Sequence, residues 1–241
     1  MTTTLIIPGL RSSGTEHWQS WFEEHIPGAI RVGQHDWDQA NLADWTSRVR
    51  RHIAHAPGRI FIVAHSFGAL AAVQAANDLD DRISGALLVA PADPDKFGIA
   101  DYLPAKALAF PNIIVASTND PWMAFDRAAA WADRWGSELI SLGDAGHINI
   151  ESGYGPWPQG LLILDRLRRA ADWKEQISRR ISDSTSHERR PHAGRKSVPR
   201  PVGRFRHSDQ PHPINAAAEF LEQSGWYVSP PARASGIPQS Q

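Results

Sequence analysis

Residues 59–70 read RIFIVAHSFGAL, and this stretch decides the fold. Its apolar first half predicts a strand that is buried on both faces of a parallel sheet. The alanine-rich sequence that follows predicts a helix. Between the two lies AHSFG (residues 64–68), which matches the pattern G-x-S-x-G with alanine in the first place. This pattern is typical of a strained strand-to-helix turn that exposes the serine hydroxyl, so Ser66 is the predicted nucleophile.

The context of this short pattern matters because a small-x-Ser-x-small match occurs often by chance. The turn requires a strand before it and a helix after it, and the sequence offers both. It also requires small residues two positions before and after the serine, where the two backbones come close. Ala64 and Gly68 meet that requirement, although alanine departs from the usual glycine.

Composition narrows the class of protein. With 241 residues and 41% hydrophobic content, the chain can form one α/β domain, or a domain with an appendage. The absence of cysteine excludes disulfides, thiolate metal sites and cysteine nucleophiles. The N-terminal sequence MTTTLIIPGL lacks a basic segment and a long apolar core, and no apolar run reaches the length of about 18 residues that a membrane span needs. We therefore expect a soluble, cytoplasmic protein.

Strands and helices are predicted to alternate along the first 173 residues. The strands are expected at residues 3–7, 29–32, 59–64, 83–89, 112–117 and 138–141. The helices are expected at residues 17–24, 42–54, 67–77, 122–135 and 159–173. This alternation predicts an α/β three-layer sandwich with a mostly parallel sheet of about six strands. In such sheets ligands bind at the carboxyl ends of the strands, so partners for Ser66 should lie on the loops that follow strands.

A serine hydroxyl needs a base, usually histidine, to accept its proton. His147 follows the last predicted strand on the loop GDAGHIN, and it is the predicted base. His65, although adjacent to Ser66, should point away from the hydroxyl. The other histidines considered lie on a helix or in the polar tail: His52, His55, His187, His192, His207 and His212.

The carboxylate that orients the base should come from another loop between the serine and the histidine. Asp120, in the sequence STNDP just after a predicted strand, is favoured for this role. It could also cap the helix that is expected to begin at Trp122. Asp144 is a competitor, and Asp93 and Asp95 are a third option.

Two backbone N–H groups are expected to stabilise the oxyanion of acyl transfer. The first is the N–H of Phe67, the residue after the nucleophile. The second is the N–H of Leu10, on the Pro8-Gly9-Leu10 loop after the first predicted strand. Because Gly9 has no side chain, this loop can approach the nucleophile closely.

These motifs together resemble a known family. The segments PGL…GTEHW, AHSFG, STNDP and GDAGHIN…ESGYGPWP are similar to the small α/β-hydrolases of the serine hydrolase family that includes retinoblastoma-binding protein 9. The similarity covers about residues 3–170. It implies a compact α/β-hydrolase with a minimal lid and with Ser66, Asp120 and His147 as the catalytic triad. The retinoblastoma association of the namesake uses an L-x-C-x-E segment, which a chain without cysteine does not carry, so that role is not expected.

The residues around the predicted site suggest the kind of substrate. Residues 91–110 are the main place for a cap and are too few for a lipase-like lid. Trp18, Trp122 and Trp157 lie on or beside the site loops and are candidate walls of an acyl pocket, although core packing is the commoner role of tryptophan. We expect a small ester, thioester or amide as substrate and no metal or organic cofactor.

The last part of the chain differs in charge and composition. Residues 174–241 hold 11 Lys+Arg and 6 Asp+Glu, whereas residues 1–173 hold 14 and 20. The sequence predicts a hydrolase domain over 1–173 and a basic, Arg/Ser/Pro-rich, largely disordered tail with a short helix near 215–228. No specific nucleic-acid or membrane partner is expected for this tail. An alternative hypothesis is a catalytically weak, hydrolase-like binding protein that uses the tail to hold a partner.

Overall fold

The computed structural model describes residues 1–188 of the 241-residue chain. The chain divides into two units, residues 1–195 and 196–241, and all the described residues belong to the first. The Arg-rich sequence from residue 189 onward and the helix expected near residues 215–228 lie outside the described residues.

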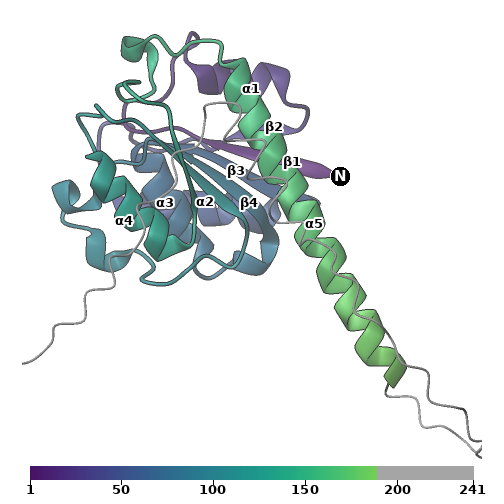
Figure 1. The fold of residues 1–241 in the computed structure, drawn as a ribbon. Coiled ribbons are helices and arrows are strands. Elements are labelled where there is room, and N and C mark those ends of the chain that lie inside the picture. Colours follow the sequence, from purple (N-terminus) through teal and green to yellow (C-terminus); the bar gives the residue numbers. More distant parts are fainter. Residues whose placement is uncertain (189–241) are drawn as a thin grey trace, which may run out of the picture. The chain divides into compact units, whose positions relative to one another are not determined.

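A six-stranded sheet forms the centre of the first unit (Figure 1). Its strands are β1 (Thr2–Ile7), β2 (Ala29–Arg31), β3 (Arg59–His65), β4 (Ile83–Val89), β5 (Asn112–Ala116) and β6 (Glu138–Ser141). They are arranged in the order β2-β1-β3-β4-β5-β6, and every neighbouring pair is parallel. The prediction of an α/β fold with a parallel sheet of six strands is confirmed.

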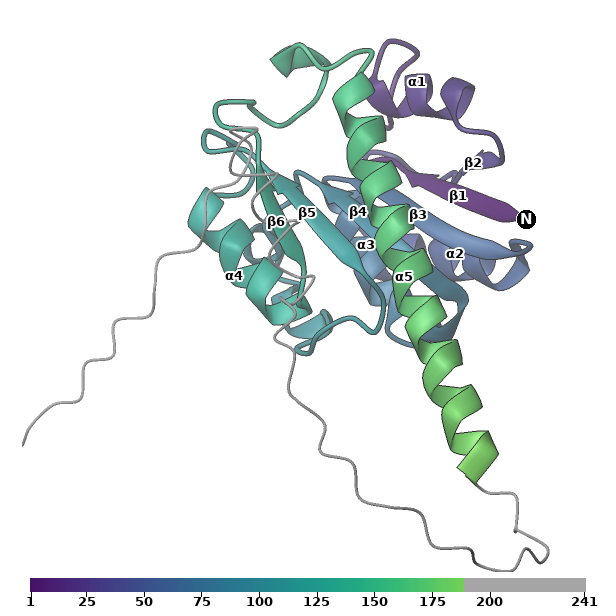
Figure 2. The ribbon, with the colours of Figure 1, turned by 45° about the vertical axis from the view of Figure 1, so that its right-hand side comes forward.

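Helices cover both faces of the sheet. The helices are α1 (Trp18–His25), α2 (Leu42–His55), α3 (Phe67–Ala76), α4 (Phe125–Trp135) and α5 (Pro158–Glu188). Figure 2 shows α5 crossing in front of the sheet, with α2 and α3 behind it. Residues of α1 and α5 share one hydrophobic cluster, and residues of α2, α3 and α4 share another. The sheet thus separates two cores.

The central strand β3 explains why its sequence is a continuous apolar run. Ile60 and Ile62 belong to the cluster beneath α2, α3 and α4, whereas Phe61 and Val63 belong to the cluster beneath α1 and α5. All four side chains are almost fully buried. Because a strand alternates its side chains between two faces, and both faces are covered, each of these four positions faces a hydrophobic core.

Two helices differ in length from the prediction. The helix α4 begins at Phe125 rather than at residue 122. The helix α5 continues to Glu188, past the expected end at residue 173, because residues 174–188 contain no glycine or proline to stop it. In Figures 1 and 2 this last part of α5 extends beyond the end of the sheet.

The segment expected to form a cap holds two short 3-10 helices, Pro94–Phe97 and Ala100–Tyr102, and lies between β4 and β5. It contains no long helix that would form a lid. No helix in the described part of the chain combines the length and the hydrophobicity that a membrane span requires.

Candidate active site

Ser66 occupies the turn between β3 and α3. Its backbone has φ 54° and ψ −128°, which is a conformation that residues with a side chain rarely adopt. Its N–H donates a hydrogen bond to the carbonyl of Val89, at the end of the neighbouring strand. A Cβ on Gly68 would lie only 2.2 Å from the carbonyl oxygen of Pro8. The first turn of α3 therefore packs so tightly on the loop after β1 that position 68 must be glycine.

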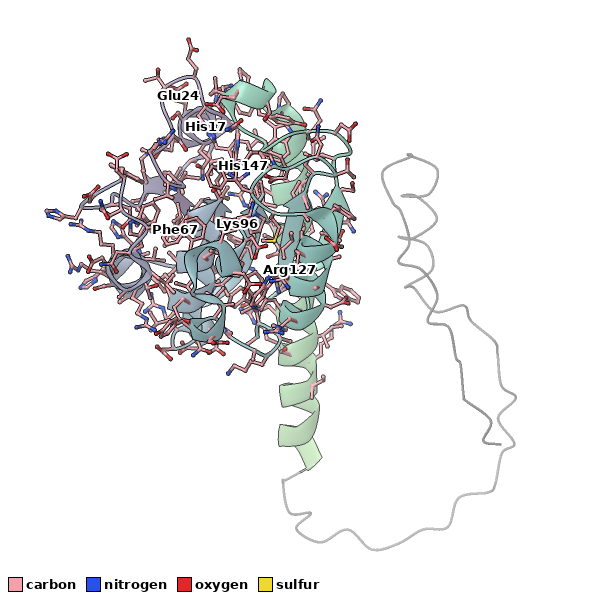
Figure 3. All side chains as sticks on the ribbon, turned by 90° about the vertical axis from the view of Figure 1, so that its left-hand side faces the viewer. His17, Glu24, Phe67, Lys96, Arg127 and His147 are labelled. Carbon is pink, nitrogen blue, oxygen red and sulfur yellow. The ribbon has the colours of Figure 1, made fainter. Side chains whose placement is uncertain are left out.

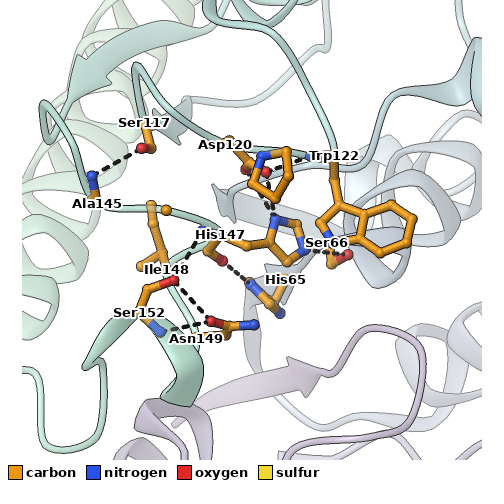
Figure 4. Close-up of polar contacts among 12 residues, drawn as sticks. His65, Ser66, Ser117, Asp120, Trp122, Ala145, His147, Ile148, Asn149 and Ser152 are labelled. Atoms are coloured by element: carbon orange, nitrogen blue, oxygen red, sulfur yellow. Dashed lines mark hydrogen bonds and ion pairs between the residues drawn. The ribbon is translucent and has the colours of Figure 1, made fainter.

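The side chains of Ser66, His147 and Asp120 form a continuous chain of hydrogen bonds (Figure 4). Nε2 of His147 lies 2.8 Å from Oγ of Ser66, and Nδ1 of His147 lies 2.9 Å from Oδ2 of Asp120. The loops after β3, β5 and β6 supply the three residues, all at the carboxyl edge of the sheet. Both the imidazole and the carboxylate are almost buried, with 9% and 3% of their side chains exposed. The structure thus brings together the three residues that the sequence had singled out.

The structure also shows what the other acidic residues do. Oδ1 of Asp144 accepts a hydrogen bond from the hydroxyl of Thr118, and both Asp93 and Asp95 form ion pairs with Arg127. None of these three carboxylates contacts His147. The alternative prediction, that Asp120 caps a helix beginning at Trp122, is wrong. Asp120 does accept the N–H of Trp122, but this bond closes a turn that precedes the helix.

The loop that carries His147 is held by polar side chains on several sides. The N–H of His147 donates to Oγ of Ser152, whose hydroxyl donates in turn to Oδ1 of Asn149. The N–H of Gly146 donates to Oδ1 of Asn119 at 2.7 Å. No sequence motif marks these residues, although each lies within five positions of His147 or Asp120.

His65 also holds this loop in place through a hydrogen bond. Its Nε2 lies 2.9 Å from the backbone carbonyl oxygen of His147, which can only accept, so the ring donates this bond. The ring points away from the Ser66 hydroxyl. Burial holds the pKa of His65 well below its usual range, with the neighbouring rings of His147 and His17 as smaller causes. His65 is therefore a neutral donor that positions the His147 backbone.

The loop after β1 packs directly against the nucleophile. A Cβ on Gly9 would lie 2.7 Å from Cβ of Ser66, so a side chain at this position would collide with Ser66. This approach brings the next residue, Leu10, to the wall of the cavity that contains Ser66. Phe67 is the first residue of α3, where an N–H has no intrahelical acceptor. Within the described residues neither N–H donates a hydrogen bond.

A cavity of about 370 Å³ opens over Ser66 and His147. Its wall includes the apolar side chains of Leu10, Phe97 and Trp122, and the polar side chains of Arg11, Asp38 and Glu151 at exposed positions. Cavities of this volume suit small ligands.

The three tryptophans expected to form this wall lie in different places. Trp122 does line the cavity, 47% exposed, with its ring centroid 6.1 Å from that of His147. Trp18 and Trp157 do not reach it. Their rings pack edge to face in the core at 5.3 Å, and Trp18 donates its indole N–H to the carbonyl of Ile148. The prediction that Trp18 and Trp157 line the pocket is therefore wrong, because both rings are buried in the core beneath α1 and α5.

Comparisons with known proteins identify the family and the fold of the chain. The serine hydrolase family model matches residues 4–166. A putative YdeN-like hydrolase from Pectobacterium atrosepticum is 42% identical, with a TM-score of 0.65 over 73% of this chain and 92% of that chain. The ydeN gene product from B. subtilis is 19% identical and shares the fold, with a TM-score of 0.59 over 70% of this chain and 100% of that chain.

A structure of Est1E from Butyrivibrio proteoclasticus with ferulic acid bound also shares the fold. It is 14% identical, with a TM-score of 0.52 over 74% of this chain and 90% of that chain. No curated protein matches the chain. The narrower resemblance to the group that includes retinoblastoma-binding protein 9 stays a prediction. The family match, together with the α/β-hydrolase neighbours, shows that this chain belongs to the serine hydrolase family.

Proposed function

We propose that this serine hydrolase cleaves a small ester, thioester or amide through a Ser66-His147-Asp120 triad and an acyl-enzyme. The observation that carries the proposal is the chain of hydrogen bonds from Ser66 Oγ through the imidazole of His147 to Asp120. A hydroxyl alone is a weak nucleophile, and a base within hydrogen-bond distance is what activates it.

Each of these groups has a defined part in the proposed reaction. Oγ of Ser66 attacks the carbonyl carbon of the substrate while Nε2 of His147 accepts the hydroxyl proton. Asp120 accepts the Nδ1–H of His147, which holds the ring in the correct tautomer and stabilises its charged form. His147 then donates the proton to the leaving group, and the acyl-enzyme remains. Attack by water, with His147 again as base, releases the acid and restores Ser66.

The N–H groups of Phe67 and Leu10 donate hydrogen bonds to the oxyanion of the tetrahedral intermediate in the proposed reaction. Two features support the assignment: the contact of Gly9 with Ser66, and the lack of a hydrogen-bond acceptor for either group in the described residues. Removing a single oxyanion donor typically costs about 10²–10³ in kcat.

The cavity supports a substrate of modest size. Its volume of about 370 Å³ lies near the lower end of the range for ligand pockets, roughly 300–1,000 Å³. Trp122 and Phe97 offer apolar surface beside Ser66. A panel of p-nitrophenyl esters of increasing acyl length is expected to show best kcat/KM for short or medium chains.

The first experiment labels the protein with a fluorophosphonate probe, which reacts with an activated serine. We expect wild type to label and Ser66→Ala to remain unlabelled. Ser84→Ala is the matched control, because Ser84 lies on β4 near the end of the sheet opposite to Ser66. Equal labelling of wild type and Ser66→Ala would overturn the assignment.

A further inference from the structure

A third histidine, His17, lies in the wall of the cavity beside Ser66 and His147. It is the N-cap residue of α1, and only 6% of it is exposed. Neither the triad nor the two oxyanion donors uses it. Figure 3 shows His17 and His147 at the same end of the domain.

The hydrogen bonds of His17 fix its tautomer. Nδ1 of His17 lies 3.1 Å from the backbone nitrogen of Gln19, whose N–H can only donate. Nδ1 is therefore the acceptor, and the proton of the neutral ring is on Nε2. Burial, with Arg31 and His147 as smaller causes, lowers the pKa of His17 to about 4. The ring is thus neutral near pH 7, with one N–H on the side opposite to the helix cap.

This N–H has no acceptor among the residues that the structure describes. The ring lines the cavity, and Nε2 of His17 is not one of the fully buried polar atoms that lack a partner in the described residues. Water or a bound ligand in the cavity can therefore supply the acceptor. An acceptor oxygen on the substrate would satisfy this donor and displace the water.

The position of His17 separates it from the expected oxyanion site. Its ring packs on His65 with 5.2 Å between the ring centroids, and Trp18, the first residue of its helix, belongs to the core cluster beneath α1 and α5. Phe67 and Leu10 pack instead in the cluster on the other face of the sheet. His17 therefore lies toward the face of the sheet that carries α1 and α5, whereas the side chains of Phe67 and Leu10 lie on the other face.

We propose that His17 is a specificity-determining residue, whose Nε2–H donates a hydrogen bond to a substrate oxygen other than the reacting carbonyl oxygen. The preferred substrates then carry an ether, hydroxyl or carbonyl oxygen a few bonds from the scissile carbonyl, in the acyl or the alcohol part. This inference rests on the proposed hydrolysis at Ser66. It narrows the substrate class from any small ester to oxygenated ones.

The test uses two pairs of esters that differ by one oxygen in place of one methylene. The acyl pair is p-nitrophenyl 3-methoxypropionate and p-nitrophenyl pentanoate. The alcohol pair is 2-methoxyethyl butyrate and butyl butyrate, followed by acid release. The ratio of kcat/KM within each pair is measured, because this ratio cancels any effect of a variant that acts equally on both substrates.

Two substitutions separate the functions of the two ring nitrogens. His17→Asn places an acceptor near the position of Nδ1 and keeps the cap of α1, but it removes the distal donor. His17→Gln can place an N–H near the position of Nε2. Thermal unfolding of both variants checks that α1 remains packed.

We expect wild type to prefer the oxygenated ester in one pair, which also tells whether the acyl or the alcohol part is bound. His17→Asn should reduce that preference roughly threefold to tenfold, the range for one neutral hydrogen bond. His17→Gln should retain more of it. Unchanged ratios in His17→Asn for both pairs would overturn the inference. Fluorophosphonate labelling of wild type distinguishes this failure from a failure of the proposed hydrolysis.

Discussion

The ring of His65 donates a hydrogen bond of 2.9 Å to the backbone carbonyl of His147, so the residue before the nucleophile holds the residue proposed as its base. The two residues are 82 positions apart in the chain. The contact ties the loop after β6 to the end of β3 and holds the backbone that carries the imidazole of His147.

Replacing His65 tests this contact. His65→Phe keeps an aromatic ring but removes the donor, and leaves the carbonyl of His147 without its partner. We expect kcat to fall roughly tenfold, the effect of about 1.4 kcal/mol on the barrier, with little change in KM. His65→Gln, which can donate, should recover part of the loss. An unchanged kcat in His65→Phe would show that the loop does not depend on this bond.

Asp120→Asn should remove most of the activity without unfolding the protein. The amide can no longer accept the Nδ1–H of His147 through both oxygens, and its own N–H favours the wrong tautomer of the ring. The analogous change in a Ser-His-Asp protease lowers kcat about 10⁴-fold. Asp144→Asn is the control, because Asp144 bonds to Thr118 instead. Similar kcat values for the two variants would contradict the role of Asp120.

Two glycines of the loop before His147 form a matched pair. Both have positive φ, 54° for Gly146 and 64° for Gly143. A Cβ on Gly146 would lie 2.3 Å from Oγ of Ser152, whereas a Cβ on Gly143 meets nothing within 4 Å. Gly143→Ala should cost only the backbone strain, about 1 kcal/mol of stability. Gly146→Ala should also displace Ser152 and lower kcat.

Steady-state kinetics and chemical denaturation measure both effects. Equal kcat values for Gly146→Ala and Gly143→Ala would show that the contact with Ser152 does not position His147.

The free energy of unfolding should fall as the pH is lowered from about 6.5 toward 4. The pKa of His17 is lowered to about 4 and that of His65 well below its usual range, both mainly by burial. The unfolded chain therefore takes up protons that the folded chain does not, and stability is complete only above the unfolded pKa near 6.5. Each group adds a slope that approaches about 1.4 kcal/mol per pH unit.

Denaturant titrations at several pH values measure this slope. His17→Asn should show a shallower fall than wild type over the same range. Parallel curves for the two proteins would mean that His17 does not contribute.

Truncation after Glu188 should leave kcat/KM for a p-nitrophenyl ester within about twofold of the full chain, well under the 1.4 kcal/mol of a tenfold change. The triad, the proposed oxyanion donors and the cavity all lie within the described residues, and the family match ends at residue 166. Loss of hydrolysis on truncation would contradict the expectation that residues 1–188 carry the activity. The alternative of a catalytically weak binding protein would gain support if neither form hydrolyses the ester and truncation abolishes the binding of a partner.

Much of the fold follows from local patterns in the sequence. The apolar runs predicted all six strands to within one residue of their observed bounds. The signal is strongest in the central strands β3, β4 and β5, because a strand buried on both faces leaves little freedom in composition. Helix ends were less well predicted. Hydrophobic periodicity does not reveal the turn near Trp122 that Asp120 holds. It also does not reveal that α5 continues past residue 173.

The sequence by itself determined the parallel α/β sheet and the order of the strand-end loops, because residue periodicity and turn chemistry are local properties. It also pointed to Ser66, Asp120 and His147, since loops after parallel strands meet at one edge. Only the tertiary structure decided that Trp18 and Trp157 are core residues, that His65 holds the His147 loop, and that His17 faces the cavity. Those roles depend on which distant atoms come within hydrogen-bond or packing distance, and local sequence does not encode that distance.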